Sequence, residues 1–192
     1  MNKAVLIRHG ESEANVLRIV DDDVEAKYHL TDVGKGQVNY ALTQLKKLKL
    51  NKVVSSPILR AKETAEIIAQ ALNIEVDIDA DLREAGQGSK VNNGYDQLPP
   101  LYRDFTGQET WEIIATRMRR ALERHEGNCV VVSHALPIRC LVSSYLGITE
   151  EPSAFGIQVD TASMSCVDVS AKKVFSVGSF VISGKIVRHF TS

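Results

Sequence analysis

The sequence predicts an α/β fold: a three-layer sandwich with a mostly parallel central sheet, helices on both faces, and an inserted lid. Short apolar runs alternate with longer stretches of helical periodicity along the chain. This alternation is typical of a sheet that is covered by helices on both faces. A segment rich in glycine, asparagine and proline interrupts the pattern at about 85–108, where we predict the lid. The length of 192 residues suits one domain, so we assign residues 1–192 to a single domain that includes this insertion.

The first half of the chain should contain three strands and two helices. The strands are short and largely apolar, as buried strands are, at residues 4–7, 52–55 and 74–78. Thr31 can cap a helix whose apolar positions extend from Val38 to Leu48. Ser56 and Pro57 supply a capping hydroxyl and a proline suited to the first helical position, so we expect the second helix to begin there.

The second half continues the same alternation after the insertion. An amphipathic pattern predicts a helix over about 109–125. The run CVVV at 129–132 is the most apolar of the chain and predicts a central strand. A helix should follow over 135–146 and end at Gly147. The tail at 156–182 alternates and is rich in valine, serine and phenylalanine, which favours strands at the edge of the sheet.

The composition argues against several classes of protein. The net charge of −1 gives no reason to expect a nucleic-acid or membrane partner, and no apolar stretch is long enough to span a membrane. The three cysteines are odd in number, far apart and without a C-x-x-C pair, so neither a disulfide framework nor a structural zinc site is expected. The apolar run before Arg8 is too short for a signal peptide. These observations predict a cytoplasmic protein.

Three of the predicted strands end in polar residues that could share one site. Arg8 and His9 follow the first strand, the pair at 55–56 ends the second, and His134 comes shortly after the CVVV run. In open α/β folds, ligands bind beyond the carboxyl ends of the strands. We therefore expect these segments to meet at one edge of the sheet.

These side chains match the requirements for cleaving a phosphomonoester. Cations and N–H donors must surround the charged phosphoryl oxygens, and the chain can supply these from Arg8, Arg60 and His134. His9 can act as the nucleophile, and Glu84 can protonate the leaving oxygen. Nearby guanidinium groups would disfavour the protonated form of His9 and keep its lone pair available for attack. The hypothesis requires a His9 ring that a phosphate can reach.

Six segments, in this order, resemble the motifs of the histidine phosphatase superfamily, in its phosphoglycerate mutase-like branch. They are LIRHGESEAN at 6–15, LTDVGKGQ at 30–37, SSPILRAKETA at 55–65, LREAGQG at 82–88, GQETW at 107–111 and VVSHALPIR at 131–139. The resemblance covers nearly the whole chain. It implies that His9 is the phosphorylated histidine and that Glu84 is the proton donor. The phosphate ligands that it implies are Arg8, Asn15, Arg60 and His134. It implies no metal and no other cofactor, and a small phosphorylated metabolite as the partner.

Four functions remain open, of which a phosphatase for small phosphomonoesters is the leading interpretation. Cofactor-dependent phosphoglycerate mutases of this branch carry more basic residues and an E-R-H-Y-G pattern after the donor glutamate, which this chain lacks, so mutase activity is the alternative. A non-catalytic phosphate-binding module would be expected to have lost His9 or Glu84, and both are present. A phosphatase of phosphohistidine proteins would be expected to lack the insertion. Within the insertion, the predicted substrate contacts are Lys90, Tyr95, Tyr102 and Arg103.

The remaining charged groups are interpreted as parts of the solvated surface. The triplet Asp21-Asp22-Asp23 reads as a solvated loop. A basic run on one helix reads as a solvated face, and its members are Arg117, Arg119, Arg120 and Arg124. Three further histidines read as ordinary surface or interface residues: His29, His125 and His189. Strands at an exposed edge could pair between two chains, which makes a homodimer a further hypothesis.

Overall fold

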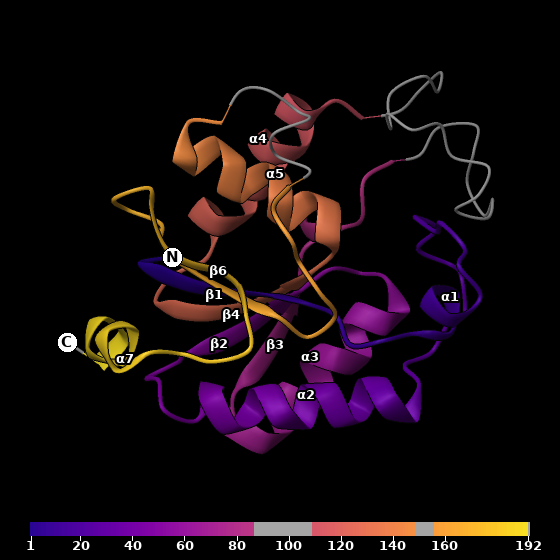
Figure 1. Cartoon of the computed structure of the whole chain (residues 1–192), viewed down its shortest axis with the longest axis horizontal. Helices are drawn as coiled ribbons and strands as arrows, with labels where there is room; N and C mark the ends of the chain where they lie inside the picture. Colours follow the sequence, from indigo (N-terminus) through magenta and orange to yellow (C-terminus); the bar gives the residue numbers. More distant parts are fainter. Residues whose placement is uncertain (87–108, 149–155, 192) are drawn as a thin grey trace.

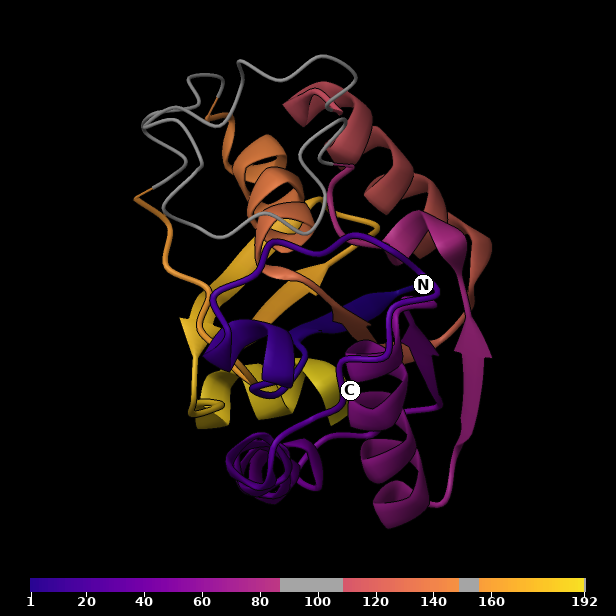
Figure 2. The same ribbon diagram turned by 90° about the vertical axis from the view of Figure 1, so that its right-hand side faces the viewer.

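A six-stranded sheet lies between two layers of helices (Figures 1 and 2). The computed structural model describes residues 1–86, 109–148 and 156–191. One face of the sheet is covered by α4 (Trp111–Arg124) and α5 (Ala135–Leu146). The other face is covered by α2 (Asp32–Leu45) and α3 (Leu59–Leu72). The predicted α/β class, with helices on both faces, is confirmed. The lid was predicted at about 85–108, and from residue 87 onward it lies outside the described residues.

The sheet is mostly parallel, as predicted. Its strands are β1 (Lys3–Arg8), β2 (Lys52–Ser55), β3 (Glu75–Ile78), β4 (Asn128–Ser133), β5 (Met164–Asp168) and β6 (Lys173–Ser179). Their order is β3-β2-β4-β1-β5-β6. The first four strands in this order run parallel, whereas β5 is antiparallel to both of its neighbours. The CVVV run therefore forms a central strand, as its apolar character predicts.

Alternation along β1 supplies side chains to two cores. Ala4 and Leu6 pack with residues of α4 and α5, whereas Val5 and Ile7 pack with residues of α2 and α3. All four are fully buried. Successive side chains of a strand point to opposite faces, so an unbroken apolar run is what a strand buried on both faces requires. The three cysteines are also buried, as small apolar residues are expected to be.

Two helix boundaries test the capping predictions with different results. Thr31 caps α2 as predicted, because its hydroxyl accepts the backbone N–H of Gly34 over 3.0 Å. The predicted start of α3 at Ser56 and Pro57 is wrong, since this helix begins at Leu59 after an Ile58 cap. The Ser56 hydroxyl accepts the backbone N–H of Ile58 over 3.3 Å and also lies 2.8 Å from His134 Nε2. The group that the sequence pattern assigned to a helix end therefore also contacts a buried imidazole.

The tail of the chain departs from the prediction in two respects. Of its two strands only β6 lies at an edge of the sheet, because β5 lies between β1 and β6. After β6 the chain forms a helix that was not predicted, α7 (Gly184–Thr191), which lies on the same side of the sheet as α2 and α3 (Figure 2). Ile186 and Phe190 are buried in the core on that side. Within the described ranges, no helix is long and apolar enough to cross a membrane.

Candidate active site

The carboxyl ends of β1, β2 and β4 meet at one edge of the sheet, as expected. Arg8 stands opposite Ser133 in the β1–β4 register, and Ser55 stands opposite Val132 in the β2–β4 register. The backbone N–H of His9 donates to the carbonyl oxygen of Ser133 over 3.0 Å. The rings of His9 and His134 consequently lie side by side, with centroids 5.1 Å apart.

The hydrogen bonds of His9 define its tautomer. Nδ1 lies 2.7 Å from the carbonyl oxygen of Gly10, and a carbonyl only accepts, so Nδ1 carries the proton. Arg60 Nε donates to His9 Nε2 over 3.1 Å, so Nε2 carries the lone pair. Nε2 is thus the nitrogen that could attack phosphorus. A lone pair that accepts a hydrogen bond cannot attack at the same time, so this Arg60 contact must break first.

His9 is buried, and here the expectation of an accessible ring is wrong. Only 2% of its surface is exposed, because the sheet edge and the Arg60 side chain enclose it. Burial, followed by the charges of Arg60 and Arg8, holds the pKa of His9 well below its ordinary value. The neutral ring that the chemistry requires is therefore favoured. A phosphate can reach the ring only if the site opens from the arrangement seen here.

His134 lies between His9 and two further polar groups. Arg60 Nη2 approaches His134 Nδ1 at 3.4 Å, and a guanidinium only donates, so the proton of the neutral ring sits on Nε2 and points to Ser56. Burial, followed by the charge of Arg60, holds the pKa of His134 well below its ordinary value. The contact of Ser56 with His134 is one that the sequence pattern did not indicate, since a serine before a helix usually reads as a cap.

Glu84 approaches the same cluster from the end of the short 3₁₀ helix η1 (Ala80–Leu82). Its Oε2 lies 4.0 Å from His134 Nδ1, and its Oε1 accepts the backbone N–H of Ala85 over 2.8 Å. Burial raises the pKa of the Glu84 carboxyl, against the opposing charges of Arg60 and Arg8. A carboxyl that keeps its proton at higher pH than usual is suited to act as an acid.

Asp21 holds Arg60 in place, which corrects its interpretation as a solvated loop residue. Its Oδ2 lies 2.7 Å from Arg60 Nη1, and its carbonyl oxygen accepts Arg60 Nη2 over 2.9 Å. The two side chains are only 1% and 4% exposed, respectively. Arg60 was predicted to bind phosphate, and in this structure Asp21 occupies part of the guanidinium fork that a phosphate would use.

Replacing Asp21 with alanine should lower the free energy of unfolding by about 3–5 kcal/mol, because it leaves the Arg60 charge buried without its partner. Urea denaturation of the purified protein measures this change. The matched control is Asp23→Ala, in the same loop but exposed, with an expected loss of about 1 kcal/mol or less. Equal losses in the two variants would show that the ion pair contributes little.

The other predicted phosphate ligands, Arg8 and Asn15, have hydrogen bonds to other parts of the chain. Arg8 Nη1 donates to the carbonyl oxygen of Val159 over 2.9 Å. Asn15 lies in the short helix α1 (Glu13–Val16), where its Oδ1 accepts the backbone N–H and the hydroxyl of Ser12. The amide nitrogen of Asn15 is therefore the group that can donate to an anion. No contact between Asn15 and His9 is described, so its phosphate role stays a prediction.

Close packing of two glycines holds the loop that carries His9. A Cβ on Gly10 would lie 2.6 Å from the carbonyl oxygen of Gly34, and a Cβ on Gly34 would lie 2.0 Å from that of Glu11. The N-terminus of α2 can therefore pack directly on the backbone after β1. The backbone N–H of Glu11 donates to Gln37 Oε1 over 2.9 Å. The carbonyl oxygen of Glu11 accepts the backbone N–H of Thr31 over 3.0 Å. The LTDVGKGQ segment thus supports the loop of the candidate nucleophile.

The basic run on α4 is only partly a solvated face. Arg120 and Arg124 are exposed by 62% and 48% of their side chains, as predicted, and both pair with Asp81. The prediction is wrong for Arg117, whose side chain is 3% exposed and pairs with Glu109. The reason is its position on the inner side of α4, beside the segment that carries Glu84.

The remaining predictions concern side chains outside this cluster. His29 is exposed and bonded to Glu63, His125 lies beside Asp79, and His189 stacks on a phenylalanine of β6. Among the residues that the structure describes, no three His, Cys, Asp or Glu side chains gather in a way that could hold a metal ion. The predicted substrate contacts of the lid lie outside the described residues: Lys90, Tyr95, Tyr102 and Arg103.

Comparison with known proteins agrees with this architecture. Residues 4–179 match the family model of the histidine phosphatase superfamily (branch 1). A 2,3-bisphosphoglycerate-dependent phosphoglycerate mutase from Thermoplasma acidophilum is 33% identical, over 98% of this chain and 98% of that protein.

Two solved structures resemble the fold closely. The alpha-ribazole phosphatase from Shigella flexneri has a TM-score of 0.77 and 24% identity, and it covers 94% of this chain and 98% of its own. A phosphoserine phosphatase mutant from Entamoeba histolytica, in complex with phosphoserine, has a TM-score of 0.77 and 22% identity over the same shares. At these identities the likeness is evidence for the fold alone.

Proposed function

Because this chain belongs to the histidine phosphatase superfamily, branch 1, we propose that it hydrolyses small phosphomonoesters through a covalent phosphohistidine on His9. The observation that carries the proposal is the state of the His9 ring. Its proton is on Nδ1, its lone pair is on Nε2, and a guanidinium lies against that lone pair. A nucleophilic imidazole needs this tautomer, with a cation beside it for the phosphoryl group, and it can attack once Arg60 turns away from Nε2.

In the first step, His9 Nε2 attacks phosphorus and forms a P–N bond. The bond from phosphorus to the leaving oxygen breaks, its electron pair stays on that oxygen, and Glu84 supplies the proton. Arg60 turns from Nε2 to the equatorial phosphoryl oxygens, where Arg8 adds further donors. His134 donates there only when its Nδ1 also carries a proton, because its Nε2 proton points to Ser56. The Gly10 carbonyl oxygen continues to accept the hydrogen bond from His9 Nδ1–H, which holds the ring in the attacking orientation.

In the second step, water releases the phosphate. The Glu84 carboxylate removes a proton from a water molecule, whose oxygen attacks phosphorus. The P–N bond breaks, its electron pair returns to Nε2, and inorganic phosphate leaves. Glu84 thereby recovers its proton and His9 its neutral tautomer, so one acid–base residue serves both steps.

The second candidate function is a phosphoglycerate mutase that depends on bisphosphoglycerate. The 33% identity to the Thermoplasma acidophilum protein, over nearly both full lengths, favours it. The same His9 chemistry would operate, with the phosphoryl group returned to an acceptor hydroxyl instead of water. Against it stands the sequence after Glu84, which lacks the E-R-H-Y-G pattern and has only Lys90 and Arg103 as cations over 85–105.

A purified-enzyme screen separates the two functions. We expect free phosphate to be released from members of a panel of phosphorylated metabolites. The panel includes 3-phosphoglycerate with a trace of 2,3-bisphosphoglycerate, and 2-phosphoglycerate is followed beside free phosphate. Conversion to 2-phosphoglycerate with little free phosphate would replace the phosphatase by the mutase. Failure to turn over any phosphoester and to form a phosphoenzyme would contradict both.

A further inference from the structure

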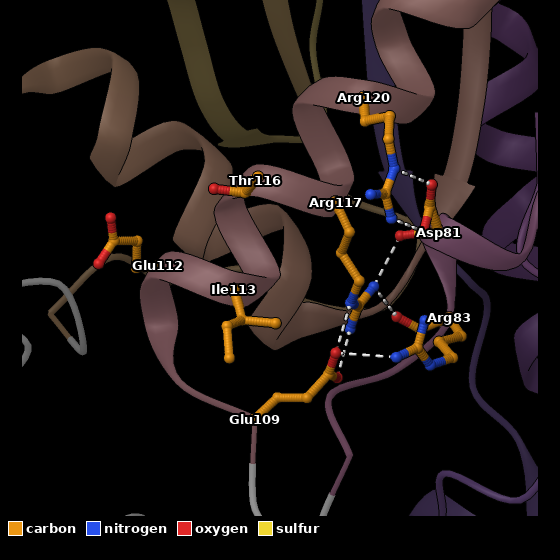
Figure 3. Close-up of a pocket in the computed structure, with 8 residues that line it drawn as sticks. All are labelled: Asp81, Arg83, Glu109, Glu112, Ile113, Thr116, Arg117 and Arg120. Atoms are coloured by element: carbon orange, nitrogen blue, oxygen red, sulfur yellow. Dashed lines mark hydrogen bonds and ion pairs between the residues drawn. The ribbon is translucent and has the colours of Figure 1, made fainter.

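Arg117 makes five hydrogen bonds from a buried position on α4. Figure 3 shows its contacts with Asp81, Arg83 and Glu109. Its Nη1 donates to the carbonyl oxygens of Asp81 and Arg83, over 2.7 and 2.8 Å. Its Nη2 donates to the carbonyl oxygen of Glu84 over 3.1 Å and to Glu109 Oε2 over 3.0 Å. Its Nε donates to Glu109 Oε1 over 3.0 Å. A guanidinium has five N–H groups, so every donor of this side chain is matched.

Glu109 completes the connection from the other side. Its Oε2 also accepts the backbone N–H of Gly86 over 2.8 Å, and its own N–H donates to the carbonyl oxygen of Gly86 over 3.1 Å. Arg83 Nη2 adds a bond of 2.8 Å to Oε1. Burial alone would raise the pKa of Glu109, but the bonds from Arg117 and Gly86 hold it below its ordinary value. The pair Arg117–Glu109 therefore makes hydrogen bonds to the backbone on both sides of Glu84.

The segment after η1 has no regular secondary structure with which to fix Glu84. Residues 83–86 belong to no helix or strand, so their backbone groups find no partners in a ladder. Three of the carbonyls between 81 and 84 converge on one side chain of a long helix instead. Because the Glu84 carboxyl reaches the leaving oxygen only over a short range, its backbone position decides whether the proton arrives.

We infer that Arg117 and Glu109 are positioning residues, which hold the Glu84 segment so that its carboxyl faces the leaving oxygen. This inference rests on the proposed role of Glu84 as the acid. Neither residue touches the reacting atoms, so the effect is transmitted through the backbone of residues 81–86. Both also line a surface pocket of about 400 Å³ beside α4, on the outer side of this segment (Figure 3).

The inference predicts a loss that depends on the leaving group. Lysine at position 117 keeps the charge but offers a single ammonium in place of the guanidinium fork. With Arg117→Lys we expect the rate on an alkyl phosphate to fall on the order of 10- to 100-fold. The comparison uses kcat/KM, which reports formation of the phosphohistidine and not its hydrolysis. On p-nitrophenyl phosphate, whose leaving group hardly needs a proton, kcat/KM should fall less than about threefold. Glu109→Gln, which keeps the shape of the side chain, should shift the ratio of the two rates in the same direction.

Two controls separate positioning from general destabilisation. Arg119→Lys changes an arginine of the same helix that bonds to Thr116 and not to residues 81–86, and should leave the ratio of the two rates unchanged. In a Glu84→Gln background, Arg117→Lys should cost little further on the alkyl substrate, since its effect acts through the acid that is already removed. Thermal melts establish that each variant is folded at the assay temperature, and Glu109→Gln serves as the test if Arg117→Lys does not fold.

The outcomes are distinct. Equal losses on both substrates in a folded variant, or no loss on either, would overturn the positioning role. Full additivity with Glu84→Gln would overturn it as well. If the unmodified enzyme hydrolyses neither substrate and forms no phosphohistidine, the proposed function fails first and the inference fails with it.

Discussion

Replacing His9 with alanine should abolish phosphoenzyme formation and reduce turnover by at least about a thousandfold. The reason is chemical as well as geometric. In this structure His9 Nε2 is an unprotonated nitrogen in contact with a guanidinium, and alanine removes the only atom to which the proposed mechanism attaches phosphorus. The loss should appear on alkyl and aryl phosphates alike, because both proceed through the same P–N bond.

Two measurements check this expectation. Steady-state release of phosphate gives turnover, and intact-protein mass spectrometry after a rapid quench detects an added phosphoryl group. The adduct should be labile in acid and stable in base, as a phosphoramidate is. The matched control is His29→Ala, which removes an exposed histidine bonded to Glu63 and should leave both measurements unchanged. A phosphoryl adduct that persists in the His9→Ala protein would place the covalent chemistry on another residue.

Changing Glu84 to glutamine should lower the rate on alkyl phosphates by about a hundred- to ten-thousand-fold. Glutamine keeps the size of the side chain but cannot donate a carboxyl proton to the leaving oxygen. On p-nitrophenyl phosphate the loss should be much smaller, because nitrophenolate leaves without a proton. Measuring kcat/KM for both substrates in one preparation gives the comparison.

The pH dependence should change in the same variant. The attacking ring must be neutral, and since the pKa of His9 is lowered, activity should rise with pH below the ordinary histidine value of about 6.5. The acid must be protonated, and since the pKa of Glu84 is raised, activity on alkyl phosphates should persist above the ordinary glutamate value of about 4.3. It should fall as pH rises through the raised pKa. Glu84→Gln should lose this falling limb and keep the rising one.

The control for both measurements is Glu112→Gln, an exposed glutamate in the first turn of α4. It should change neither the ratio of the two substrates nor the pH profile. Equal losses on alkyl and aryl phosphates in Glu84→Gln would remove Glu84 from the role of acid. An unchanged falling limb would assign that limb to another group.

Much of the fold follows from local patterns. A strand with an apolar run such as that of β4 is stable only where both faces of the sheet are covered. The strands β1 and β2 carry the same kind of run. Where a local pattern failed, a tertiary contact had replaced it. The Ser56 hydroxyl contacts His134 and the helix begins only at Leu59, and α7 formed because the core beneath α2 and α3 could bury Phe190.

Some residues of the candidate site could likewise be predicted from local patterns, whereas others depend on tertiary contacts. His9 and His134 could be predicted from the sequence, because each directly follows a strand whose end faces the same edge of the sheet. Asp21 and Arg117 could not, because their partners are distant along the chain: Asp21 is 39 residues from Arg60, and Arg117 is 34 residues from Arg83. In a sequence, a charged residue without a nearby partner is interpreted as solvated. Only the folded structure shows the distant partner that compensates for its burial.

The sequence by itself therefore determined the alternation of the main strands and helices from β1 to α5 and the edge at which the reactive side chains gather. These depend on periodicity and on position along a strand, which are properties of neighbouring residues. The tertiary structure alone decided that the His9 ring is buried and that Asp21 pairs with Arg60. It alone also decided that Arg117 and Glu109 pair with each other beside the Glu84 segment. Burial and ion pairing arise between segments far apart in the chain, so only the packed molecule specifies them.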